Sequence, residues 1–112
     1  MALDTQNLVE LTLAICNIES VSSNESALAD QVQQTLEQSN WLETTRHGNT
    51  LIARTNLNRE KRVVIAGHLD TVPVANNLPA QLHHFEREQV IVGRGSVDMK
   101  GGVAVMLKLA VE

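Results

Sequence analysis

The sequence predicts an α/β fold, because helical periodicity marks its two ends and β-prone runs fill its middle. Apolar residues recur every three or four positions over residues 5–18 and again over residues 25–38. Short β-prone runs follow, and a largely apolar helix begins at Gly101. With 112 residues, of which 43% are apolar, the chain has room for one small domain.

Two amphipathic helices are expected to open the chain. Asp4 precedes the first helix as its expected N-cap, and Ser22 with Glu25 has the spacing of a capping box before the second. Each helix carries one apolar stripe. The stripes consist of Leu8, Leu11, Ile15 and Ile18 in the first helix and of Leu28, Val32 and Leu36 in the second.

The middle of the chain predicts strands. Residues 42–46 and 50–55 are β-prone runs on either side of a turn that contains Gly48, which is typical of a hairpin. Residues 62–66 are apolar after Arg62, and a continuous run of this kind predicts a strand buried on both faces.

The last third of the chain predicts irregular structure, one strand and a helix. Residues 73–84 contain two prolines and paired asparagines and are expected to be irregular, whereas residues 89–92 predict a short strand. The helix from Gly101 is apolar around most of its circumference and is expected to be buried. Glu112 is neither a cap nor a terminator, so we expect the chain to be the front part of a larger domain; fraying at a natural C-terminus is the alternative.

Composition argues against several classes of function. A net charge of −4, one Trp, one Phe and no Tyr argue against a nucleic-acid partner. No run of eighteen apolar residues is present, so no membrane partner is expected, and the first residues lack the basic and apolar regions of a secretory signal. The single Cys16 is expected to be a reduced core residue, which predicts a cytoplasmic location.

Metal-binding side chains follow the apolar run at residues 62–66. The next seven residues are Gly-His-Leu-Asp-Thr-Val-Pro, and in an extended segment His68 and Asp70 point to the same side. This geometry suits a histidine that binds a metal ion through one ring nitrogen while the aspartate orients the ring. We interpret His68 as a metal ligand and Asp70 as the candidate catalytic carboxylate beside it.

A second carboxylate follows the next predicted strand. Residues 93–102 are Gly-Arg-Gly-Ser-Val-Asp-Met-Lys-Gly-Gly, in which the glycines allow a sharp turn and a close approach to a ligand. Asp98, at the mouth of the last helix, is positioned to bridge two cations. A histidine and two carboxylates just past apolar strands are typical of a metal centre for hydrolysis. The alternative is that His68 and Asp70 only pair with each other and that Asp98 is a helix N-cap.

Three other motifs carry less weight. The Gly-x-Gly at residues 93–95 lacks the third glycine of a dinucleotide loop, and Asp98 in its place would repel a pyrophosphate. His83 and His84 point to opposite faces of an extended segment, and we expect them to be surface loop residues. Ser96 lacks the Gly-x-Ser-x-Gly elbow of a serine nucleophile.

Together, the motifs at residues 67–73 and 93–102 resemble the paired signature of the aminoacylase/carboxypeptidase family of di-zinc metallohydrolases. The resemblance spans nearly the whole chain and implies the N-terminal part of a three-layer zinc-peptidase-like catalytic domain, incomplete within residues 1–112. It implies that His68 ligates the first zinc ion, that Asp98 bridges both zinc ions and that Asp70 steadies the His68 imidazole. The peptide bond after this bridging aspartate is often cis in the family.

The activity implied by the resemblance is metal-dependent hydrolysis of a linear amide bond in a small-molecule N-acyl amino acid. Two Zn²⁺ ions would occupy the complete site, with Co²⁺ or Mn²⁺ as alternatives. The overall likeness favours removal of succinate from N-succinyl-LL-2,6-diaminopimelate, on the route to lysine. Another N-acyl-amino-acid deacylase or a dipeptidase of the family is the alternative, and a non-catalytic remnant module is a further one. The complete protein is expected to be a homodimer.

Several residues of the family have no counterpart in this sequence. The general base is a glutamate of a Glu-Glu pair, and another carboxylate ligand, a second histidine and a lid or dimerisation domain also come later in the family. One histidine and one bridging aspartate do not fill a tetrahedral zinc shell. We therefore expect the 112 residues alone to bind zinc weakly, to be inactive, and to be poorly stable or self-associating.

Overall fold

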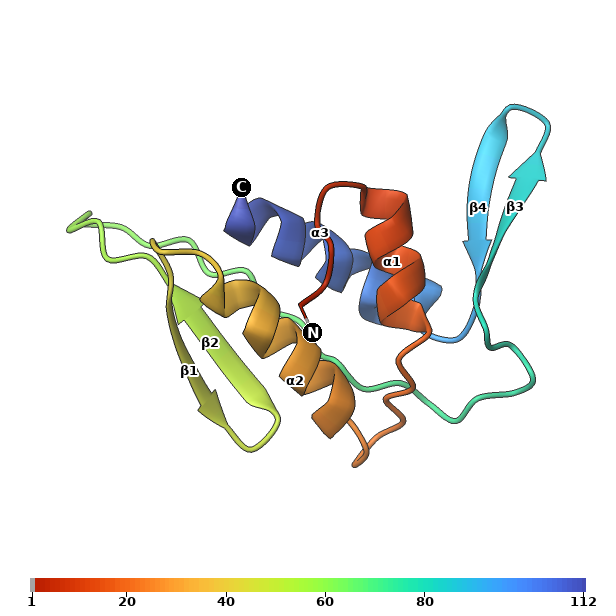
Figure 1. Ribbon diagram of the computed structural model, residues 1–112, viewed down its shortest axis with the longest axis horizontal. Coiled ribbons are helices and arrows are strands. Elements are labelled where there is room, and N and C mark those ends of the chain that lie inside the picture. The colour runs from red at the N-terminus through yellow and green to blue at the C-terminus, as the bar shows by residue number, and fades with distance from the viewer. Residues whose placement is uncertain (1) are drawn as a thin grey trace.

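The computed structural model describes residues 2–112, in which three α-helices lie between two β-hairpins (Figure 1). Strands β1 and β2 form one antiparallel sheet, and β3 and β4 form another. The predicted α/β class is thus confirmed. The elements in chain order are α1 (Leu8–Cys16), α2 (Ser26–Glu37), β1 (Glu43–His47), β2 (Thr50–Arg54), β3 (Gln81–Phe85), β4 (Glu88–Val92), the short helical turn η1 (Ser96–Lys100) and α3 (Gly101–Val111).

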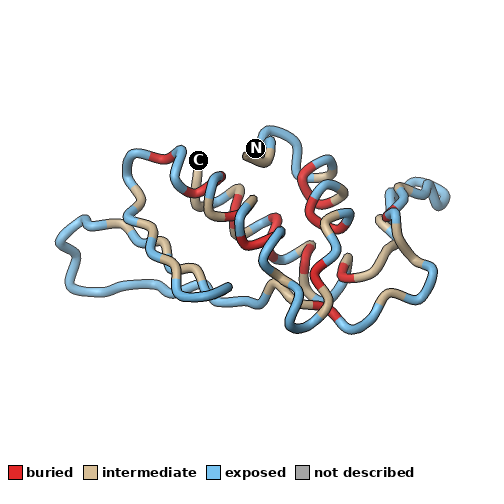
Figure 2. The backbone as a smooth tube through the Cα atoms, turned by 60° about the horizontal axis from the view of Figure 1, so that its bottom comes forward, coloured by how far each residue is buried: buried red, intermediate tan, exposed pale blue. Residues whose placement is uncertain are grey.

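The hydrophobic core lies between the three α-helices, and α3 contacts both α1 and α2. The predicted stripes supply most of it, although Leu8 at the start of α1 is half-exposed. Cys16, expected in the core, is fully buried. Figure 2 shows the buried positions gathered along the helices, with the hairpins exposed or intermediate. The core cluster consists of Leu11, Ile15, Leu28, Val32, Leu36, Val103, Ala104 and Leu107.

The two predicted helix caps are wrong. Asn7 rather than Asp4 caps α1, because its Oδ1 accepts hydrogen bonds from the amides of Val9 and Glu10 at 2.9 and 3.2 Å. At α2 no side-chain capping bond forms. The capping box expected from Ser22 is absent because its hydroxyl instead bonds a residue far along the chain, as described below.

The first hairpin has the predicted position. Strands β1 and β2 pair in register around Gly48, whose φ of +61° is the left-handed conformation that such a turn requires. The Arg46 guanidinium of β1 lies 2.6 Å from the Asp30 carboxylate of α2 and 3.0 Å from the Gln33 side-chain oxygen. These contacts fasten the hairpin to the helical core.

The predicted buried strand at residues 62–66 is wrong. This segment pairs with no other part of the described chain, and Val63, Val64 and Ile65 are 87%, 77% and 57% exposed. A strand is defined by hydrogen bonds to a neighbour, whereas the apolar composition reports only the preference of the segment itself. Composition alone was therefore insufficient to predict a paired strand here.

The second hairpin was predicted in part. Strand β4 occurs where residues 89–92 indicated it, but its partner β3 forms within the stretch expected to be irregular. His83 and His84 consequently lie in a strand rather than in a loop, and both side chains are exposed. Both prolines that favoured irregular structure, Pro73 and Pro79, lie before the first residue of β3, so neither is part of the strand.

The third helix begins at Gly101 as predicted, but one side of it is exposed. Val103, Ala104 and Leu107 face the core, whereas Val105 and Leu109 are 42% and 62% exposed. Among the described residues, none of the helices has both the length and the apolar character needed to cross a membrane.

Candidate metal centre

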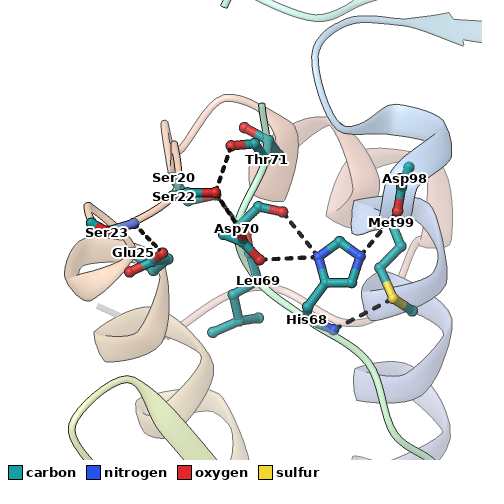
Figure 3. A network of polar contacts seen from close by, with 10 residues as sticks. All are labelled: Ser20, Ser22, Ser23, Glu25, His68, Leu69, Asp70, Thr71, Asp98 and Met99. Carbon is teal, nitrogen blue, oxygen red and sulfur yellow. Dashed lines mark hydrogen bonds and ion pairs between the residues drawn. The ribbon is translucent and has the colours of Figure 1, made fainter. Parts of the chain in front are cut away.

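An open cavity of about 320 Å³ lies where the two motifs meet. Ser22, His68, Asp70 and Asp98 are among the residues that line it. The structure therefore brings together all three candidate site residues, although His68 and Asp98 are 30 positions apart in the sequence. Figure 3 shows how the side chains converge.

The His68 imidazole lies between two aspartates. Its Nε2 atom is 3.0 Å from Asp98 Oδ1, and its Nδ1 atom is 3.0 Å from the Asp70 carbonyl oxygen and 3.2 Å from Asp70 Oδ1 (Figure 3). Both ring nitrogens thus face acceptors, which favours a ring that carries protons on both. The contact with the Asp70 carbonyl raises the pKa of His68 most, and the hydrogen bond to Asp98 raises it further.

The Asp70 carboxylate is held on its other side by a serine. Ser22 Oγ donates a hydrogen bond to Asp70 Oδ2 at 2.5 Å, while Oδ1 faces His68. The Ser22 hydroxyl is the main cause that lowers the pKa of Asp70, because it stabilises the ionised carboxylate. Asp70 is therefore anionic at neutral pH and can support a positively charged or metal-bound imidazole.

Asp98 lies on the turn η1, where its extended backbone (φ −130°, ψ 94°) interrupts the helical path. The Asp98–Met99 peptide bond is cis, as the family resemblance implies. Neither η1 nor α3 receives a side-chain capping bond, so the alternative interpretation of Asp98 as an N-cap is wrong. Its side chain is 84% exposed and contacts His68 through Oδ1.

The two candidate ligand atoms for a metal ion are close together in this arrangement. Zinc bonds of about 2.1 Å at a tetrahedral angle place two ligand atoms about 3.4 Å apart. His68 Nε2 and Asp98 Oδ1 are 3.0 Å apart, about 0.4 Å closer than that separation. No group of three or more His, Cys, Asp or Glu side chains able to hold a metal occurs within residues 2–112. The described chain thus fits part of a zinc shell.

No sequence pattern indicates the role of Ser22. Its partner Asp70 is 48 positions away, and no local spacing connects a serine before α2 to a carboxylate after an apolar run. The spacing of Ser22 to Glu25 instead indicated a capping box, which is a local motif. His83 and His84, on β3, do not line the cavity.

Comparison with known proteins connects this site to a family. Residues 64–112, which contain both motifs, match the Peptidase family M20/M25/M40. A Mycobacterium tuberculosis protein described as “Putative succinyl-diaminopimelate desuccinylase” is 50% identical over 103 residues, which are 91% of this chain and 28% of that protein. The succinyl-diaminopimelate desuccinylase of Corynebacterium glutamicum is 40% identical over 101 residues, 88% of this chain and 26% of that protein. A “Probable carboxypeptidase” of Paracoccidioides lutzii is 30% identical over 120 residues, 94% of this chain and 27% of that protein.

Residues 64–112 thus match this family, and the family resemblance carried by the two motifs is confirmed. Within that family, the chain is similar to proteins described as succinyl-diaminopimelate desuccinylases at 40–50% identity. The chain spans about 28% of the length of the first of these relatives.

Proposed function

We propose that residues 1–112 are the N-terminal portion of the catalytic domain of a metal-dependent hydrolase that cleaves a linear amide bond. The observation that carries this proposal is the convergence of His68, Asp70 and Asp98 beside one open cavity. The substrate we propose is N-succinyl-LL-2,6-diaminopimelate, which water would cleave to succinate and LL-2,6-diaminopimelate. The names of the relatives at 40–50% identity support this choice.

His68 Nε2 and Asp98 would hold the metal, and Asp98 has a second carboxylate oxygen with which to reach a neighbouring ion. Bound zinc, cobalt or manganese would supply an acidified water and a charge that stabilises the oxyanion. Asp70 accepts from His68 Nδ1, so it keeps the opposite nitrogen directed at Asp98. Ionised Asp70 would also offset part of the positive charge that a bound cation brings next to the imidazole.

A second candidate function is hydrolysis of another N-acyl amino acid or of a peptide. The fungal relatives described as carboxypeptidases, at about 30% identity, favour it. The cavity residues of this chain surround the candidate metal ligands and do not distinguish one acyl group from another. We also propose a cytoplasmic location, on the basis of the single reduced Cys16, and a homodimeric complete protein, on the basis of the resemblance.

Activity of the protein from its complete reading frame tests the proposal. Zinc-loaded protein is expected to release succinate from N-succinyl-LL-2,6-diaminopimelate faster than it releases acetate from N-acetyl amino acids or cleaves dipeptides. His68→Ala should reduce kcat/KM at least 100-fold, because a ligand is lost. The matched control is His83→Ala, whose histidine lies on β3 outside the cavity and should leave the rate unchanged.

Three other outcomes have definite meanings. Faster cleavage of a dipeptide or an N-acetyl amino acid would replace the proposed substrate with the second candidate. Undiminished turnover in His68→Ala would contradict the metal role of this residue. Absence of amide hydrolysis at saturating zinc would favour a non-catalytic module. The 112-residue chain alone should release no succinate.

A further inference from the structure

Residues 18–22, between α1 and α2, contact both motifs of the candidate metal centre. We call this segment the strap. It runs beside the first motif, where Val21 and Thr71 form an isolated parallel bridge. It also accepts a hydrogen bond from Lys100, which belongs to the second motif. The strap is therefore the part of the helical side that touches both halves of the site.

Four hydrogen bonds of 3.0 Å or less join the strap to the first motif. The Ser22 amide donates to the Thr71 carbonyl at 3.0 Å, and the Thr71 amide donates to the Ser20 carbonyl at 2.9 Å. Ser20 Oγ donates to the Leu69 carbonyl at 2.7 Å, and both Ser20 and Thr71 are buried. The fourth bond, from Ser22 Oγ to Asp70 Oδ2, ends on the carboxylate that contacts His68 (Figure 3).

One buried ammonium group joins the strap to the second motif. Lys100 is 1% exposed, and its Nζ donates to the Ile18 carbonyl at 2.6 Å. Lys100 follows Asp98 by two residues, so this bond fixes the end of the turn that carries the second carboxylate. A Cβ atom at Gly95 would lie 2.9 Å from both Lys100 Cδ and Thr71 Cγ2, which shows how closely the two motifs pack here.

We propose that Ser22 is a positioning residue for the metal centre: with the strap anchored by Lys100, its hydroxyl orients Asp70 and thereby sets the His68 ring against Asp98. This inference rests on the proposed function. Ser22 contacts neither His68 nor Asp98 directly, so it acts through Asp70. Rotation of the Asp70 carboxylate is restricted because Oδ2 is bonded to Ser22 while Oδ1 faces His68 Nδ1.

The test compares five variants of the protein expressed from its complete reading frame. Ser22→Ala removes the hydroxyl, Ser22→Thr retains one, and Ser23→Ala is the matched control because the neighbouring Ser23 side chain makes no hydrogen bond within residues 2–112. Lys100→Met removes the strap anchor. Two quantities are measured at one fixed pH: the Kd for Zn²⁺, by competition calorimetry, and the ¹⁵N chemical shifts of the His68 ring in metal-free protein.

Ser22→Ala is expected to raise the Kd for Zn²⁺ about tenfold and to shift the His68 ring resonances, since loss of such a supporting contact typically costs 10–100-fold in metal affinity. Ser22→Thr should restore the Kd to within about threefold, and Ser23→Ala should change neither quantity. Lys100→Met, if folded, should also raise the Kd. The control for Lys100→Met is Lys108→Met, which removes the hydrogen bonds that the Lys108 ammonium group donates to the Thr5 and Gln6 carbonyls, away from the site.

Unchanged Kd and unchanged His68 resonances in Ser22→Ala would overturn the inference. If Lys100→Met does not fold, the result for Ser22→Ala alone decides the test. A wild-type protein that binds no zinc would refute the proposed function instead. In that case the His68 resonances of Ser22→Ala, compared with Ser23→Ala, still decide whether Ser22 positions the ring.

Discussion

The helical side of the molecule and the segment at residues 62–66 have similar apolar composition and opposite environments. Val103 of α3 is 4% exposed, whereas Val64 is 77% exposed. The helices cover one another, and each satisfies its own backbone hydrogen bonds within the helix. The apolar segment at residues 62–66 needs a neighbouring strand to cover its side chains and to pair its backbone hydrogen bonds. None of residues 2–112 supplies such a strand. Burial is therefore decided by which elements have partners.

The candidate metal centre lies at the junction of these two regions. His68 lies two residues after the exposed segment, and Asp98 lies three residues before Gly101, where α3 begins. The strap at residues 18–22 comes from the helical side and bonds to both motifs. The arrangement of the candidate site therefore depends on the well-packed helical region, even though one candidate ligand, His68, lies beside the exposed segment.

The largest loss of stability is expected from Gly95→Ala, a substitution at this junction. Gly95 has a φ of +85°, and an added Cβ would lie 2.9 Å from Lys100 and from Thr71, both of which are buried. The left-handed conformation alone costs about 1–2 kcal/mol, and overpacking adds about 1–3 kcal/mol. Urea unfolding of the 112-residue chain measures the sum.

Gly48→Ala is the matched control for this prediction. Gly48 also has a positive φ, of +61°, but no atom lies within 4 Å of the place its Cβ would occupy. Its substitution should cost only the conformational part, about 1–2 kcal/mol. Equal losses for the two variants would show that the two motifs are not tightly packed at Gly95.

The next effect compares two valines directly. Val103→Ala should lower the free energy of unfolding by about 1.5–3 kcal/mol, because two buried methyl groups and their packing are lost. Val64→Ala should change it by less than about 0.5 kcal/mol in the 112-residue chain, since the side chain is exposed. If the complete protein covers this segment, as we propose for a larger catalytic domain, Val64→Ala should become as costly there as Val103→Ala. A small effect of Val64→Ala in both proteins would contradict that proposal.

The smallest effect is the pH dependence that His68 contributes. Its pKa is raised in the folded chain by the Asp70 carbonyl and then by Asp98, so the folded state binds its proton more tightly than the unfolded state does. The resulting stabilisation is full below the unfolded value of about 6.5 and is lost as the pH rises through the raised folded value. The ring is half-exposed, so the effect is modest.

Urea midpoints of the metal-free chain between pH 5.5 and 8.5 measure this contribution as the difference between wild type and His68→Ala. The wild-type midpoint should fall relative to that of the variant as the pH rises. Parallel pH profiles would contradict the contacts described for the ring.

Local sequence patterns predicted the helices and the first hairpin, because helical periodicity and turn chemistry are contained within short segments. They also indicated His68 and Asp98, which stand in motifs specific enough to identify the family. The exposed state of residues 62–66 was not predictable in this way, since strand pairing depends on distant parts of a chain. Strand β3 was missed because the prolines just before it suggested irregular structure throughout.

The support of the site was equally hidden in the sequence. Ser22 and Asp70 are 48 positions apart, and Lys100 and Ile18 are 82 positions apart. Side-chain hydrogen bonds over such separations leave no periodic signal in a single sequence. Lys100 in particular is a charged residue that composition would assign to the surface, yet it is fully buried.

Anomalous diffraction at the zinc edge, from crystals of the complete protein grown with zinc, would show whether His68 and Asp98 bind the metal. We expect an anomalous peak about 2.1 Å from His68 Nε2 and from a carboxylate oxygen of Asp98, with Asp70 on the opposite side of the imidazole. A zinc peak held by other residues, with His68 and Asp98 still bonded to each other, would contradict the account.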